Sequence, residues 1–163
     1  MRFTSLILLL LLPSLTFSQS GWTRAKKSAF LKADFAFFTA KNYYTPLGNK
    51  LTTNRFNQFN FSFYGEYGLK DRLTLIGSGP LLRVHAYETT SPVFGQGDLQ
   101  FQLKYRLTSN KFPVSISFGP EIPTGRANAF AKDKQLPGVE INLPTGDGEF
   151  NFWTTLAASK SFG

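Results

Sequence analysis

The stretch "GDLQFQLKYRL", from Gly97 to Leu107, decides the fold class of this chain. Apolar and polar side chains alternate along it, and a period of two residues indicates a β-strand, whose successive side chains point to opposite faces of a sheet. In a soluble sheet the apolar face would form the core, whereas in an outer-membrane barrel the same face would meet lipid. The stretch therefore predicts a strand and leaves open which of its faces is inside.

Five further runs have strand-like patterns, and after the N-terminus no segment has a helical period. Residues 29–38 and 55–69 reach the length of about ten residues that a tilted membrane crossing needs. The remaining runs cover residues 72–84, 112–123 and 149–162, the first of them interrupted by glycines and a proline. We therefore expect an all-β fold, an antiparallel up-and-down transmembrane β-barrel with about six strands present, which makes an incomplete barrel.

The connections between these runs alternate in length. The second and third runs are joined by "KDR" and the fourth and fifth by "TSNK", whereas residues 39–54, 85–96 and 124–148 form long connections. Short periplasmic turns and long extracellular loops are typical of outer-membrane barrels. A sandwich with Greek-key crossings has no reason to alternate so regularly, so the pattern favours the barrel.

The N-terminus predicts export from the cytoplasm. A basic start precedes the apolar run "LILLLLLP", which is too short to span a bilayer, and small residues follow it. We expect residues 1–18 to be a removed signal peptide, 19–28 a periplasmic N-terminal tail, and 29–163 the N-terminal portion of an outer-membrane β-barrel. The absence of cysteine excludes a disulfide scaffold and argues against a lipid anchor.

The composition fits a membrane surface better than a nucleic acid. The chain is 16% aromatic, with 18 Phe, and aromatic girdles at two membrane interfaces would use this excess. Its net charge of +8 suggests anionic surroundings such as lipopolysaccharide. The basic residues are scattered except for "RAKK", residues 24–27, which a solvated tail explains as well, so we expect no nucleic-acid partner.

The two faces of the predicted strands supply the candidate site residues. The polar face would line the lumen, where charges of both signs more often fill and rigidify the wall than select solutes. The lumen-lining candidates are Lys32, Asp34, Glu66, Asp98, Gln100, Gln102, Lys104, Arg106 and Glu121. The lipid-facing candidates are Phe59, Phe61, Phe63, Leu99, Phe101, Leu103 and Tyr105.

Catalytic and metal sites have little support in the sequence. His85 is the only histidine, and it lies near Glu88 and Ser91 at the start of a long connection, without a nucleophile motif. One loop carboxylate, Asp147, beside Glu149 falls far short of a calcium site. We therefore expect no enzyme, no catalytic residue, no metal and no cofactor.

Four segments carry a resemblance to a known family. They are "YGLKDRLTL" from Tyr67, "GQGDLQFQLKYRL" from Gly95, "FPVSISFGPEIPTG" from Phe112 and "LPTGDGEFNFW" from Leu143. They resemble the outer-membrane barrels of the MetA-pathway of phenol degradation family, transporters related in concept to the FadL and toluene channels. The most specific elements are Gly97 with Asp98 and the two Pro-Thr-Gly turns, Pro123 to Gly125 and Pro144 to Gly146.

The resemblance implies a porin-like outer-membrane channel for passive uptake of small, often hydrophobic or aromatic solutes in a Gram-negative bacterium. Its expected partners are outer-membrane lipid, lipopolysaccharide, the barrel-assembly machinery and a small solute. This sequence departs from the family in lacking a C-terminal half, and six strands fall short of the eight that close a single-chain barrel, so we expect an N-terminal fragment.

Two alternatives remain open at the level of sequence. One is a soluble secreted β-sandwich or lipocalin-like ligand-binding protein, in which the apolar face lines a core or a cavity. The other is a barrel without transport that anchors surface loops. Heat-modifiable migration and extraction by detergent would separate the barrel from the soluble protein, and a flux measurement would separate the two barrels.

Overall fold

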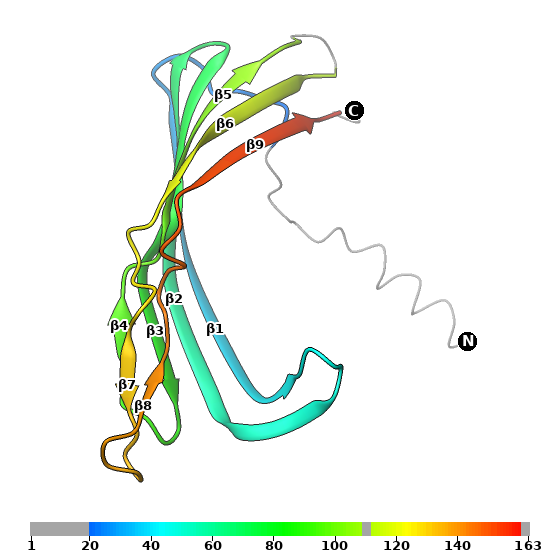
Figure 1. The fold of residues 1–163 in the computed structure, drawn as a ribbon. Coiled ribbons are helices and arrows are strands. Elements are labelled where there is room, and N and C mark those ends of the chain that lie inside the picture. Colours follow the sequence, from blue (N-terminus) through cyan, green and yellow to red (C-terminus); the bar gives the residue numbers. More distant parts are fainter. Residues whose placement is uncertain (1–19, 109–111, 161–163) are drawn as a thin grey trace, which may run out of the picture.

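One antiparallel sheet, curled into an open half-barrel, is the main element of the computed structural model, which describes residues 20–108 and 112–160 (Figure 1). Its main strands follow one another in chain order, which confirms the all-β, up-and-down prediction. The expected signal peptide lies outside the described residues. The six main strands are β1 (Ala29–Tyr44), β2 (Lys50–Lys70), β3 (Leu73–Tyr87), β5 (Leu99–Arg106), β6 (Val114–Ile122) and β9 (Asn151–Ala158).

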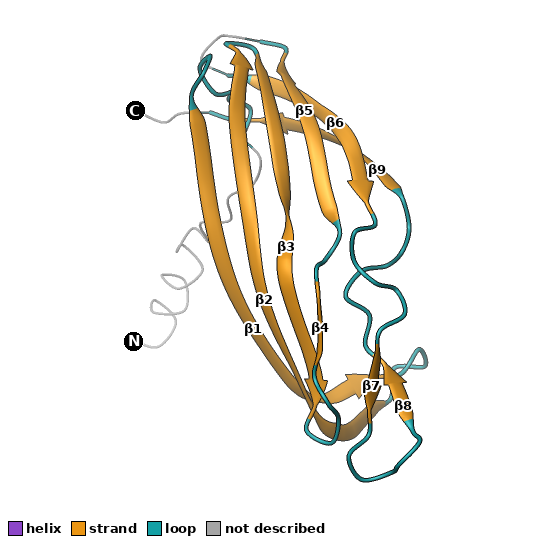
Figure 2. Cartoon of the chain, turned by 90° about the vertical axis from the view of Figure 1, so that its left-hand side faces the viewer, coloured by secondary structure: helices purple, strands orange, loops and turns teal. Residues whose placement is uncertain are grey.

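Three short strands lie in the long connections, where the sequence predicts only loops. Strand β4 (Val93–Gly95) pairs with the end of β3, and β7 (Phe130–Lys132) pairs with β8 (Glu140–Asn142) in a separate sheet. Figure 2 shows them at the end of the half-barrel opposite the short turns. Strands of three residues are too short to show a period of two, so the pattern could not reveal them. Within the described part of the chain, no helix is long and apolar enough to cross a bilayer.

The prediction of a long loop over residues 39–54 is wrong. Strands β1 and β2 continue through most of it as a two-stranded ribbon, and only residues 45–49 form the turn. The turn closes with Gly48 at a φ of 82°, a conformation that glycine adopts readily. Polar pairs such as Thr52 and Asn42, whose side-chain oxygens lie 2.9 Å apart, replace the apolar alternation that marks the rest of the strands.

The strand register gives the sheet two different faces. Directly paired residues of antiparallel strands share a face, and Lys104 of β5 pairs with Thr74 of β3 and Ser117 of β6. The adjacent Leu103 pairs with Leu75 and Phe118. One face is therefore mainly polar and the other apolar, and the two alternate along every main strand.

The polar face is the buried one where β3, β5 and β6 lie side by side. Lys104, Thr74 and Ser117 are each at most 2% exposed, and we call the face that carries them the inner face. On the opposite face, the outer face, Phe35 is 70% exposed and Leu75 is 42% exposed. The only buried apolar cluster of the described residues gathers beside β4, β7 and β8. It consists of Val93, Ala129, Ala131 and Leu143.

Strands β5 and β6 approach each other closely at Gly119. A Cβ atom at this position would lie 1.9 Å from the backbone oxygen of Phe101, a distance that real Cβ atoms essentially never show. Gly77 of β3 offers a comparison, because its added Cβ would meet the Phe101 ring at an ordinary 3.6 Å. The two glycines therefore lie in the same sheet under different steric constraints.

We predict that Gly119→Ala destabilises the sheet by about 1–3 kcal/mol, because β5 and β6 must separate to admit the methyl group. Gly77→Ala is the matched control and should change the free energy of unfolding by less than about 1 kcal/mol. Urea unfolding followed by circular dichroism measures both. Equal effects of the two substitutions would contradict the close approach at Gly119.

Candidate functional site

The inner face gathers the polar candidates that the sequence singles out. Register places the polar candidates of β1, β2, β5 and β6 on this face, and Asp98 continues the same alternation just before β5. These residues are Lys32, Asp34, Glu66, Gln100, Gln102, Lys104, Arg106 and Glu121. The apolar candidates share the outer face, and they are Phe59, Phe61, Phe63, Leu99, Phe101, Leu103 and Tyr105.

Lys104 is the most deeply buried charged group of the inner face. Its side chain is 1% exposed, and its Nζ has no hydrogen-bond partner among the described residues. Glu66 and Arg24 are the charged groups that act on it electrostatically, with opposite signs. An ammonium group that is removed from water without a paired anion is costly, so the burial of Lys104 needs an explanation.

Glu66 is shared by residues from two parts of the chain. Its Oε2 lies 2.5 Å from Nε of Arg24, and its Oε1 accepts a hydrogen bond of 2.5 Å from the Tyr64 hydroxyl. The Arg24 guanidinium also lies over the Phe30 ring, 4.6 Å from its centroid, which is a cation–π distance. Arg24 therefore pairs with Glu66, whereas Lys104 Nζ has no hydrogen-bond partner among the described residues.

Arg24 belongs to a segment that we call the N-terminal strap, residues 20–28. The strap crosses the short-turn end of the half-barrel, from beside β9 to the start of β1 (Figure 1). The amide of Gly21 donates to Ser159 Oγ at 2.8 Å, and the amide of Arg24 donates to Thr74 Oγ1 at 2.9 Å. The basic residues 24–27 suggest a solvated tail. Composition alone cannot reveal backbone hydrogen bonds such as these.

Asp98 is the meeting point of the most specific sequence motifs. Its Oδ1 accepts a hydrogen bond from the amide of Gly125, and its Oδ2 accepts one from the amide of Asp147, each 2.9 Å long. A Cβ at Gly146 would lie 2.4 Å from Asp98 Oδ1, so only glycine fits there. The Gly-Asp pair and the two Pro-Thr-Gly turns, which the sequence presents as separate backbone devices, thus form one structure that we call the Asp98 knot.

The Asp98 knot fixes the long connection between β6 and β9 against the sheet. Arg83 on β3 donates from Nη1 to the carbonyl oxygen of Thr145 at 2.6 Å, and Arg126 donates to the carbonyl oxygen of Phe94. Farther along, Ala131 and Leu143 pack into the buried apolar cluster. The connection therefore lies along the wall over much of its length.

Three carboxylates, one of them Asp98 itself, come together at the Asp98 knot. Asp98, Glu121 and Asp147 each offer an oxygen, and these oxygens lie within 4.8 Å of one another. Oxygen clusters of this kind suit hard cations, but here the chain's own donors use them. Trp153 Nε1 donates to Glu121 at 2.7 Å, and the amides described above donate to Asp98. We therefore assign the cluster a structural role.

His85 is buried on the inner face, away from the polar residues that follow it in sequence. Its ring packs edge-on against Phe56 at a centroid distance of 5.8 Å. Ser91 Oγ accepts a hydrogen bond from the amide of Lys132, and Glu88 forms an ion pair of 3.4 Å with Arg55. The three residues thus have different surroundings, and the arrangement offers no nucleophile–base contact among them.

Comparison with family models, curated proteins and solved structures gave no match to this chain. Lys32 and Asp34 form an exposed ion pair of 3.5 Å on the edge strand β1. Lys104 is buried, whereas the Arg24 side chain that pairs with Glu66 is 40% exposed. The buried Lys104 and the Asp98 knot distinguish the inner face from an ordinary polar surface.

We predict that Asp98→Ala releases the connection between β6 and β9, because two backbone amides lose a charged acceptor at about 1.5–3 kcal/mol each. Trypsin should then cleave at Arg126, Lys132 and Lys134 faster than in the parent. Glu149→Ala is the control, since this exposed carboxylate lies in the same connection and is not part of the Asp98 knot. Equal cleavage rates in the parent and Asp98→Ala would contradict the pinning role.

Proposed function

We propose that this chain forms the wall of an outer-membrane β-barrel channel for the passive uptake of small hydrophobic or aromatic solutes. The reversal of the two faces of the curled sheet carries the proposal. Lys104 and Ser117 are buried on the inner face, whereas Phe35 and Leu156 are each 70% exposed on the outer face. A soluble protein normally buries the apolar face, and a lipid-embedded barrel normally exposes it.

The outer face has the character of a lipid-contacting surface. Phe35 stacks on Phe61 across β1 and β2 at 4.8 Å, and Phe118 stacks on Phe152 across β6 and β9 at 6.4 Å. Outer-face grooves lie between such rings, and their lining includes Leu75, Phe101 and Phe118. An exposed apolar area of this extent would favour aggregation in water, and acyl chains are the natural occupants of such grooves.

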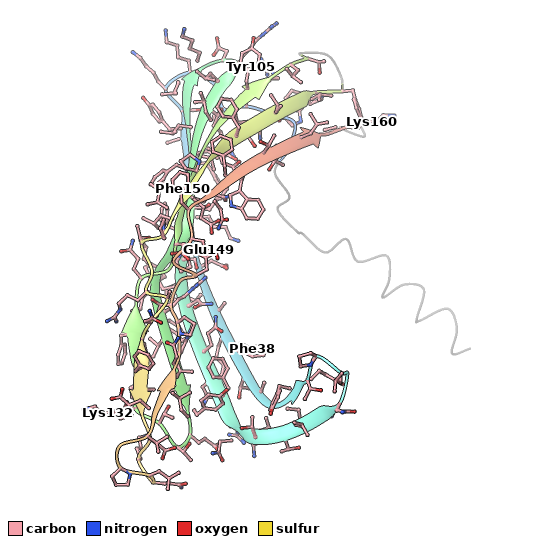
Figure 3. All side chains as sticks on the ribbon, viewed as in Figure 1. Phe38, Tyr105, Lys132, Glu149, Phe150 and Lys160 are labelled. Carbon is pink, nitrogen blue, oxygen red and sulfur yellow. The ribbon has the colours of Figure 1, made fainter. Side chains whose placement is uncertain are left out.

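The inner face suits a water-filled passage with an aromatic surface near one end. Charged groups of both signs lie on the wall, as expected of a polar lumen. At the long-connection end, Phe56 lies 5.3 Å from the Tyr87 ring and 6.4 Å from the Phe38 ring. Figure 3 shows Phe38 at this end, far from Tyr105 and Lys160. Phe56 and Tyr87 pack against the buried apolar cluster, whereas Phe38 is 55% exposed and offers a stacking surface for apolar solutes, which supports the proposed solute class.

The proposed barrel needs further strands to close it. Within the described residues, β1 and β9 each have one paired edge only. Unpaired backbone groups are costly in lipid, so both free edges must be paired in the membrane. We propose that additional strands supply this pairing, and that the barrel-assembly machinery inserts the completed wall among lipid and lipopolysaccharide.

We predict that Phe101→Arg impairs membrane assembly while the adjacent Gln100→Arg is tolerated. Phe101 lies on the outer face, where an arginine near the bilayer midplane costs about 2–4 kcal/mol, and Gln100 lies on the inner face. The fraction of heat-modifiable protein in the outer membrane measures assembly. The opposite ranking, with Phe101→Arg harmless and Gln100→Arg damaging, would support the soluble alternative and contradict the barrel.

Solute flux tests the transport part of the proposal. Liposomes that contain the full-length protein should swell faster than protein-free liposomes in solutions of a small sugar and of benzoate. Replacing the exposed Phe38 by Ala should lower the benzoate rate about threefold or more while the sugar rate is kept, because the stacking surface is lost. Swelling no faster than in protein-free liposomes would leave a barrel that only anchors loops.

A further inference from the structure

Positive charge is concentrated at the short-turn end of the half-barrel. By strand register this end comprises residues 20–28, 66–74, 104–108, 112–117 and 155–160. These residues include eight Lys and Arg but only two acids, Glu66 and Asp71. Elsewhere in the described chain basic and acidic residues are equal in number, with eight of each. The whole positive excess of the described residues therefore lies at one end.

The inner face of this end carries cations without carboxylate neighbours. Arg106 follows Lys104 by two residues, so both point to the same face of β5. Lys104 is paired with Thr74 and Ser117, and Arg106 is paired with Ser115. Neither cation forms an ion pair with a described residue, and Lys104 Nζ and Arg106 Nε are buried without a hydrogen-bond partner. A guanidinium stays protonated, so at least the charge of Arg106 is permanent.

The two acids of this end leave most of its positive charge uncompensated. Glu66 lies 2.5 Å from Arg24, so its charge balances one cation of the N-terminal strap. Asp71 is exposed in the turn between β2 and β3, where Lys70 precedes it and Arg72 follows it. The short-turn end thus presents a field of mainly one sign.

The carboxylates of the Asp98 knot lie too far along the strands to cancel this field. Glu121 is paired with Gln100, which precedes Lys104 by four residues on β5. Four residues of a strand span about 14 Å, which exceeds the Debye length of about 10 Å at 0.1 M salt. The acidic and basic groups of the inner face therefore act at separate heights of the wall.

Building on the proposed channel, we propose that the short-turn end makes the passage selective for anions, which narrows its solutes to small organic anions such as aromatic carboxylates. A field of one sign concentrates oppositely charged ions in a confined passage. Lys104 and Arg106 share the face opposite to the exposed rings of Phe101 and Phe118, so their charges act on the passage rather than on lipid. An aromatic carboxylate combines the charge that this end attracts with a ring that can stack on Phe38.

Reversal potentials of the full-length protein in planar bilayers of neutral phosphatidylcholine test this selectivity. In a gradient from 0.01 to about 0.1 M KCl, Cl⁻ should be about threefold more permeant than K⁺, because salt at this level screens the field only in part. Arg106→Gln should lower this ratio about twofold, since it removes an inner-face charge. Potassium benzoate in place of KCl should give a reversal potential of the same sign.

A second variant and a matched control complete the test. Lys26→Gln combined with Lys70→Gln removes two exposed charges from the short-turn end and should also lower the ratio, and it decides if Arg106→Gln does not fold. Lys50→Gln makes the same charge change in the ribbon at the opposite end and should leave the ratio unchanged. Conductance without anion preference, an unchanged ratio in both short-turn variants, or an equal fall in Lys50→Gln would overturn the selectivity. Absence of any conductance would overturn the channel itself.

Discussion

The register between β3 and β5 is the constraint on which the rest of the structure depends. Leu75 pairs with Leu103 and Thr74 pairs with Lys104, so apolar and polar residues fall on opposite faces. A slip of one residue would turn every side chain of one strand to the other face. The curvature of the sheet then decides which face is crowded, and here the polar one is enclosed. The burial of Lys104 on the inner face and the exposure of rings such as Phe35 on the outer face both follow from this combination.

A sheet of this kind is stabilised without a conventional core. Its strands are linked by continuous backbone hydrogen bonds, and apolar pairs such as Phe35 with Phe61 add contacts across strands. On the inner face polar groups satisfy one another, as when Ser117 donates to Gln102 at 2.9 Å. Lys104 Nζ departs from this rule, as do buried atoms of Asn60, Arg83, His85 and Arg106, and such departures are expected at strained or functional sites.

The sequence predicts the main strands and their faces because both depend on local alternation. The period of two is visible in residues 97–107 without any tertiary information. The ends of the strands are harder to recognise in the sequence. Residues 39–54 continue β1 and β2 as a ribbon, but they lack the apolar alternation that marks the rest of the two strands. The short strands β4, β7 and β8 are not predicted for a different reason, because their pairing with other segments of the chain fixes them and no local pattern marks them.

The candidate site is only partly encoded in local patterns. Asp98 and the glycines of the Pro-Thr-Gly turns stand out in the sequence as motifs, but their contact is a tertiary fact that no spacing reveals. The same holds for Arg24, whose basic neighbours suggest a solvated segment although its guanidinium lies 2.5 Å from Glu66. Long-range hydrogen bonds between a strap and a strand leave no periodic signal, so only the folded chain brings these residues together.

The most direct test of the central claim is a single-cysteine scan of β5 in lipid bilayers. A fluorophore at positions 99, 101 and 103 should be quenched by a quencher attached to lipid acyl chains, and a fluorophore at position 100 by an aqueous quencher only. This alternation would show that the apolar face meets lipid while the polar face lines water. Quenching by the aqueous agent at the odd positions, with none from the lipid, would contradict the account.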